Sequence, residues 1–234
     1  MTRIKYFSIT VYLILLLAIT GCSSSISIKA SKDNTQDLSL SLDLGEAVSK
    51  TIISATNGMQ KMSGTETAVF SRSHIESGLK KANVKNISVS CPSATKLNVK
   101  GTIISSQSDD LIAQDKDRIT VTLSPKSVQN ISKTLGEETR SFLDLFMAPV
   151  ITGEKMSDAE YIDLLETVYG KEITNDIKKA SIKFTMSVPD GCRLKKYEAP
   201  KGVSVSATDS SVNFSYPLLR LLTLTGTENA FVQW

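Results

Sequence analysis

Seven short segments of this chain alternate apolar and polar residues, and this pattern restricts the fold more than any other feature. The clearest is Leu38-Ser39-Leu40-Ser41-Leu42, in which every leucine falls on one face of an extended strand. A helix would scatter the same side chains around its axis. We therefore predict strands at residues 37–44, 97–104, 119–123, 182–188, 203–207, 212–216 and 230–234.

Helical spacing and capping signals occur between these segments. Ser73-His74-Ile75-Glu76 and Ser157-Asp158-Ala159-Glu160 both fit a capping box, in which the serine caps the first turn and the glutamate reaches back to it. The second box predicts a helix over 157–169. Strands and helices are mixed without strict alternation, which predicts an α+β fold: a mostly antiparallel sheet with helices packed on one face.

The order of these elements predicts the domain organisation. Residues 22–36 are polar with little pattern and are expected to form a tether, although Ile26 and Ile28 hint at a strand within it. Residues 37–234 are expected to form a single α+β domain. The polar stretch 105–117 is the best candidate for a linker if the domain is subdivided.

The first 21 residues have the three parts of an export signal. Arg3 and Lys5 form a positive region, and an apolar run from Phe7 to Ile19 is followed by short residues. A helix needs about 20 apolar residues to span a bilayer, so this run is too short for an ordinary membrane-spanning helix. Cleavage after residue 21 is the expected outcome.

The segment Ile19-Thr20-Gly21-Cys22 resembles the lipobox of bacterial lipoproteins, which runs branched apolar residue, short residue, Gly, Cys. The resemblance covers residues 1–22 and implies that the thiol of Cys22 receives a diacylglyceryl group. A signal peptidase then cuts before Cys22, and the new amino group is usually acylated. Each buried methylene contributes about 0.8 kcal/mol, so two or three chains would hold the protein permanently.

Two other interpretations of the N-terminus remain open: a single membrane anchor helix, or an ordinary secretory signal with a chance Gly-Cys pair. The lipoprotein interpretation places the protein in the bacterial cell envelope, exported and anchored in a membrane through acyl chains on Cys22. Ser23 after the cysteine is compatible with outer-membrane sorting if the source has an outer membrane; otherwise the outer face of the cell membrane is expected.

Charge argues against a nucleic-acid partner. The whole chain has 27 Lys+Arg and 24 Asp+Glu, a net charge of +3, and removing residues 1–21 takes away Arg3 and Lys5 and leaves +1. The sequence shows no basic stripe interleaved with aromatic residues, which nucleic-acid binding would favour. We expect no nucleic-acid partner and no cofactor.

The remaining cysteines, Cys91 and Cys192, fit no metal or redox motif. An exported protein resides where disulfides persist, so the two could be bridged across a loop of about 100 residues. The alternative is two free thiols, because Cys91 shares a strand face with Ile87 and Val89.

The sequence contains few groups that could perform catalysis. His74 is the one histidine, and it falls inside a capping box, where an exposed structural role is the expectation. Neither a nucleophile elbow nor a P-loop occurs, and the acidic residues Asp109, Asp110, Asp115 and Asp117 lack calcium-loop spacing, so we expect no metal site. A distant Asp/Glu pair for hydrolysis would leave no sequence signature.

Two apolar clusters remain, Phe142–Ile151 and Leu218–Leu224. Core packing is the simpler interpretation. The functional one is a hydrophobic groove lined by Leu143, Met147, Val150 and Ile151, because a single helix stripe accommodates only part of the first cluster. We therefore expect a non-enzymatic lipoprotein that binds a partner protein or a hydrophobic ligand; the alternative is an envelope hydrolase using an Asp/Glu pair.

Overall fold

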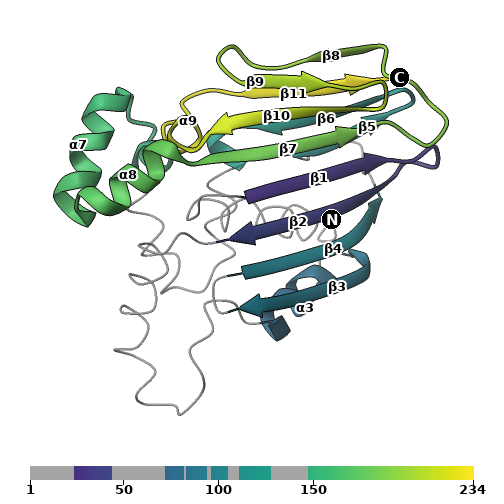
Figure 1. The fold of residues 1–234 in the computed structure, drawn as a ribbon, viewed down its shortest axis with the longest axis horizontal. Helices are drawn as coiled ribbons and strands as arrows, with labels where there is room; N and C mark the ends of the chain where they lie inside the picture. The colour runs from purple at the N-terminus through teal and green to yellow at the C-terminus, as the bar shows by residue number, and fades with distance from the viewer. Residues whose placement is uncertain (1–23, 44–71, 82, 94–95, 105–110, 128–146) are drawn as a thin grey trace.

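The structure is a computed structural model that describes residues 24–43, 72–81, 83–93, 96–104, 111–127 and 147–234. Strands predominate, and they form two sheets (Figure 1). The strands are β1 (Ser24–Ala30), β2 (Thr35–Asp43), β3 (Lys85–Ser93), β4 (Lys96–Ile104), β5 (Ile112–Asp115), β6 (Arg118–Leu123), β7 (Ser181–Ser187), β8 (Lys196–Glu198), β9 (Ser204–Ala207), β10 (Ser211–Pro217) and β11 (Glu228–Gln233).

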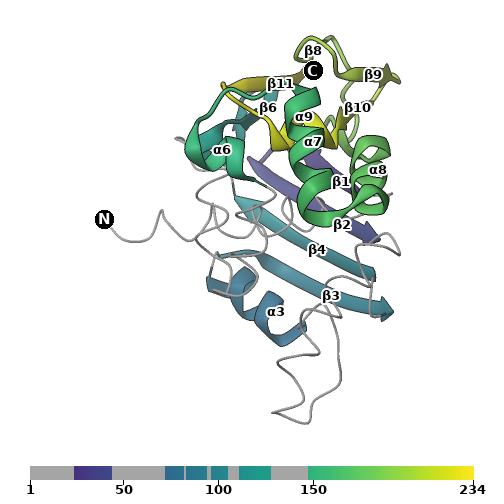
Figure 2. The ribbon, with the colours of Figure 1, turned by 90° about the vertical axis from the view of Figure 1, so that its left-hand side faces the viewer.

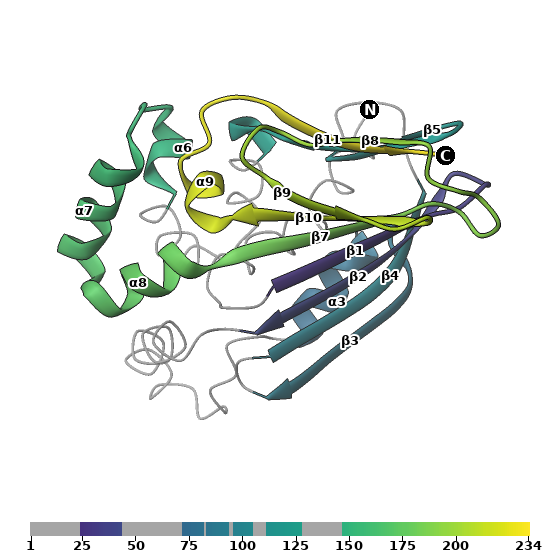
Figure 3. The same cartoon turned by 45° about the horizontal axis from the view of Figure 1, so that its top comes forward.

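The larger sheet has seven strands in the order β3-β4-β2-β1-β7-β10-β9, and the smaller has four in the order β5-β6-β11-β8. Among the described strands, eight of the nine pairings are antiparallel and β1–β7 is parallel. Figure 3 shows the smaller sheet lying over the β7–β10–β9 part of the larger one. The chain is thus an α+β protein with one mixed sheet and one antiparallel sheet.

The described helices are α3 (Arg72–Lys81), α6 (Ala148–Thr152), α7 (Asp158–Tyr169), α8 (Lys171–Lys179) and α9 (Leu218–Leu222). Helix α3 packs against β3, whereas α6–α9 gather at the end of the molecule where β7 begins (Figure 2). The expectation that the helices pack on one face of the sheet stays a prediction.

The seven segments with period-two alternation are all strands, with bounds within two residues of those expected. Helix α7 begins as the second capping box predicts: Ser157 Oγ accepts a hydrogen bond from Glu160 N, and Ser157 N donates to Glu160 Oε2 at 2.8 Å. The first box is wrong, because α3 already includes Arg72 and Ser73. Glu76 instead accepts a hydrogen bond from Arg72 Nε at 2.7 Å, one helical turn earlier.

The expected tether is also wrong for much of its length. Residues 24–30 form β1, the central strand of the large sheet, with β2 on one side and β7 on the other. Ser24, Ile26, Ile28 and Ala30 are all at most 3% exposed. The alternation is present in the sequence, but Ser and Lys on the outer face disguise a strand whose second neighbour, β7, lies some 150 residues away.

Both sheets share one core. The buried apolar residues of the described chain form a single contiguous cluster, and a buried polar contact joins the layers: Gln36 Nε2 of β2 donates to Gln114 Oε1 of β5 at 2.9 Å. The large sheet combines strands from before residue 105 with strands from after residue 180. A subdivision at 105–117 would therefore cut this sheet between β1 and β7.

Candidate functional site

The predicted anchor, Cys22, lies outside the described residues, the first of which is Ser24. Ser24 is buried at the start of β1 and pairs with Ile182 of β7. The loop after β1 is short: Asn34 adopts a positive φ of 61°, and Asp33 Oδ1 accepts a hydrogen bond from Thr35 Oγ1 at 2.7 Å. That hydrogen bond lowers the pKa of Asp33.

The structure places Cys91 and Cys192 far apart and leaves both as free, half-buried thiols. Cys91 follows Ser90 of β3, which is aligned through Asn98, Ser41 and Ser25 with Lys183, near the start of β7. Cys192 lies beyond the opposite end of β7, and β4, β2 and β1 separate the two strands. Four strand spacings of about 4.8 Å far exceed the 7 Å that a disulfide tolerates between Cα atoms, so the bridge is wrong.

Three of the four residues of the predicted hydrophobic groove lie in the described part of the chain. Met147 and Val150 are fully buried, Ile151 is half-buried against the core, and Leu143 lies outside the described residues. Helix α6 packs against α9, so the Leu218–Leu224 cluster covers the Met147–Ile151 segment. Core packing therefore accounts for Met147, Val150 and Ile151, and a contribution of Leu143 to a groove stays a prediction.

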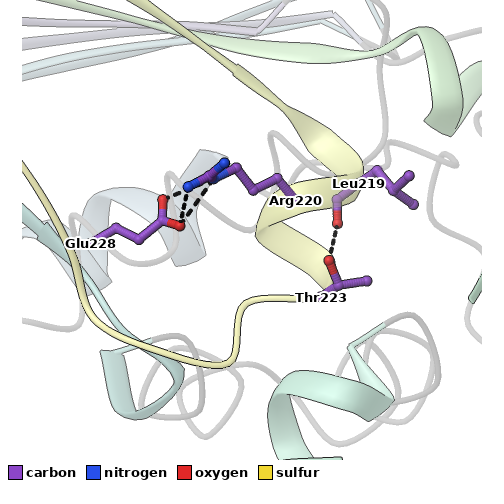
Figure 4. Close-up of polar contacts among 4 residues, drawn as sticks. All are labelled: Leu219, Arg220, Thr223 and Glu228. Carbon is purple, nitrogen blue, oxygen red and sulfur yellow. Dashed lines mark hydrogen bonds and ion pairs between the residues drawn. The ribbon is translucent and has the colours of Figure 1, made fainter. Parts of the chain in front are cut away.

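The strongest polar contact among the described residues joins Arg220 of α9 to Glu228 of β11 (Figure 4). Arg220 Nη2 donates to Glu228 Oε1 at 2.6 Å, and Arg220 Nε lies 3.1 Å from Oε2. Side-chain exposure is 32% for Arg220 and 16% for Glu228. Because the guanidinium engages both carboxylate oxygens, Glu228 fixes the turn between α9 and β11 and is poorly placed as a general acid or base.

Tyr216 lies beside this ion pair. Its ring is buried and meets Phe184 edge-on, with centroids 5.4 Å apart, and its hydroxyl has no hydrogen-bond partner within the described part of the chain. Burial raises the pKa of Tyr216, and the negative charge of Glu228 raises it further. The hydrogen bond to Glu228 likewise raises the pKa of Arg220. A phenol held neutral beside an engaged carboxylate stabilises packing and supplies no nucleophile.

The other candidates from the sequence do not converge. His74 lies in α3, Asp109 and Asp110 lie outside the described residues, and Asp115 and Asp117 flank the tip of the β5–β6 hairpin. Asp117 accepts a hydrogen bond from Gln233 Nε2 at 3.0 Å. Within the ranges that the structure describes, no group of three or more His, Cys, Asp or Glu side chains could hold a metal ion.

Each of the two sheets ends in a short, exposed strand on the same side of the molecule. Strands β8 and β9 end their respective sheets, every residue in both is exposed, and both lie along the top of the molecule in Figure 1. Val205 is 36% exposed and Tyr197 is 44% exposed. We call these two strands the β8–β9 edge.

The opposite edge of the large sheet is protected against pairing, which β9 is not. Strand β3 contains Pro92 and two register shifts against β4, devices that stop another strand from adding to an edge. Strand β9 pairs with β10 in regular register and contains neither proline nor charge. Strand β9 is therefore the less protected edge of the large sheet, with only four residues, whereas β8 carries the charged residues Lys196 and Glu198.

Sequence reasoning missed both the Arg220–Glu228 pair and the β8–β9 edge. A lone arginine within Leu218-Leu219-Arg220-Leu221-Leu222 could have signalled a partner, because a charge inside an apolar run needs one. Strand β8 has only three residues, Lys196–Glu198, too few to show a period.

No known family matches this chain, and no curated protein matches it significantly. Across the described residues, no helix is both long and apolar enough to cross a bilayer. The functional assignment therefore depends on the chain's own residues.

Proposed function

We propose that the protein is a lipid-anchored lipoprotein of the bacterial cell envelope, held by acyl chains on Cys22, and that it is a non-enzymatic binder of a partner protein. The lipobox-like Ile19–Cys22 segment carries this proposal. The burial of Ser24 in β1 is compatible with it, because Cys22 precedes this strand in the sequence. Cleavage before Cys22 would thus remove nothing from the described core.

The anchor is tested by the Cys22→Ala variant of the full chain. The wild-type protein should be cut before residue 22, should partition into detergent and should incorporate an alkyne-labelled fatty acid. The variant should remain an uncleaved, unlabelled precursor. Cleavage at the same bond and unchanged detergent partitioning in the variant would contradict lipidation at Cys22.

A partner protein is favoured over a hydrophobic ligand for two reasons. Met147 and Val150 are buried, and β9 is an exposed edge strand without proline or charge. An open edge strand offers backbone N–H and C=O groups to an extended segment, and alternate side chains supply specificity. Val205 and Tyr197 would supply the apolar contacts of such an interface.

The edge is tested by purifying the membrane-anchored protein with its bound proteins after mild cross-linking. Val205→Lys places a charge on β9, the device by which natural edge strands prevent pairing. Val168→Lys is the matched control, because Val168 is 44% exposed and lies on α7. A specific partner should be lost with Val205→Lys and retained with Val168→Lys. Recovery of the same partner from both variants would exclude this edge.

A further inference from the structure

The distance between Cys22 and the folded core is fixed by a single residue. Ser23 alone separates Cys22 from Ser24, and a two-residue step spans at most about 7 Å. Ser24 cannot serve as additional spacer, because it is 1% exposed and begins the central strand of the large sheet. Extending the linker would mean pulling β1 away from both β2 and β7.

We propose that the domain docks directly on the lipid surface, with the end of the sheet where β1 begins facing the bilayer. This inference rests on the proposed acylation of Cys22. Several strand ends gather at this end: Ser24 pairs with Ile182, Ser181 with Pro217, and Asp43 with Lys96. In Figure 1 this end of the sheet is at the left, where β1 and β4 begin and β2 ends. We call it the proximal end.

Three exposed lysines lie near the proximal end, where they could contact anionic headgroups. Helix α8 ends with exposed Lys178 and Lys179, directly before β7, and Lys183 is exposed on β7 itself. Basic side chains close to anionic headgroups are attracted over roughly one Debye length. Helices α7 and α8 also bring acidic residues to this half of the molecule: Asp158, Glu160, Asp163, Glu166, Glu172 and Asp176. The proposal therefore depends on the short link to Cys22 and not on net charge.

The opposite, distal end of the sheet lies about one strand length away. The strand from Ser24 to Lys29 advances by five residues, which corresponds to roughly 17 Å. Lys29 Nζ there lies 2.8 Å from Asp190 Oδ1, and Ser187 pairs with Ser211, just after the turn that contains Asp209. Docking through the proximal end therefore keeps Asp209 well away from the headgroups.

The test measures which end touches the lipid headgroups. Full-length protein with Cys91→Ala and Cys192→Ala receives one new cysteine, Lys179→Cys or Asp209→Cys, which is labelled with a nitroxide. The lipidated protein is reconstituted into phosphatidylethanolamine–phosphatidylglycerol vesicles that contain a nickel-chelating lipid. Relaxation of each nitroxide by the headgroup nickel reports its proximity to the surface. Lys178→Cys and Asp190→Cys repeat the comparison at neighbouring positions.

Direct docking predicts several-fold greater relaxation at residue 179 than at residue 209. A Gly-Ser insert of about 20 residues after Ser23 has a mean span of about 25 Å and should bring the ratio close to one. Equal relaxation without the insert, or a ratio that the insert leaves unchanged, would overturn direct docking.

Acylation is read independently, from the mass of the N-terminal peptide and from vesicle flotation. An acylated protein that floats with the vesicles yet shows equal relaxation refutes docking alone. A protein without acyl groups refutes the proposed anchor, and the docking inference falls with it. Urea-unfolding midpoints of the labelled variants verify that each remains folded.

Discussion

Replacing Ile28 with alanine tests whether residues 24–30 belong to the folded core or to a tether. Ile28 is 1% exposed and sits between Leu38 of β2 and Met186 of β7, both buried. Truncating a buried isoleucine to alanine removes its transfer free energy and leaves a cavity, at a cost of about 2–5 kcal/mol. A tether residue would change the free energy of unfolding by less than about 0.5 kcal/mol.

The measurement is urea and thermal unfolding of residues 22–234 carrying Cys22→Ser, with and without Ile28→Ala. A loss of about 3 kcal/mol corresponds to a fall in melting temperature of roughly 6–12 °C for a protein of this size. Ile104→Ala is the control, because it deletes the same atoms from a side chain that is 52% exposed at the end of β4. Equal, small effects of both substitutions would refute the central position of β1.

Three further outcomes are expected. Glu228→Gln should cost about 1–3 kcal/mol in urea unfolding, because it leaves the partly buried Arg220 guanidinium without its charge partner; no loss would show that the pair is dispensable. Gly101→Ala should destabilise by about 1–3 kcal/mol, since its Cβ would meet Val84 Cγ1, whereas Gly78→Ala in open space on α3 should be neutral or stabilising; the reverse order would contradict this packing. Burial raises the pKa of Tyr169 to about 12, so the folded state binds the phenolic proton more tightly than the unfolded state. The resulting stabilisation of the folded state is complete below pH 10 and is lost as the pH rises through 12. A tyrosine absorbance titration in which all phenols ionise near pH 10 while the protein stays folded would exclude this shift.

Local signals in the sequence were enough for most of the secondary structure. The alternation at Leu38–Leu42 and the capping box at Ser157–Glu160 each involve residues only a few positions apart, so their physics is contained in the sequence. The box at Ser73 is wrong because α3 already includes Arg72, whose side chain forms an ion pair with Glu76. A capping-box motif therefore predicts a helix start only when the helix does not already begin before its serine.

The sequence by itself also determined the candidate anchor, because a lipobox-like segment is recognised by contiguous residues that end at Cys22. That only one residue separates this candidate anchor from the folded core became clear only from the tertiary structure. Residues 24–30 look like a polar tether until β7 supplies a parallel neighbour from far along the chain.

Three other features likewise depend on which distant segments meet: the separation of Cys91 from Cys192, the burial of Met147 beneath α9, and the Arg220–Glu228 contact. The order of strands in a sheet depends on the packing contacts among all of its strands, and a single stretch of sequence does not show these contacts. For this reason the sequence predicted the strands and the candidate anchor residue, whereas the tertiary structure decided that residues 24–30 belong to the folded core.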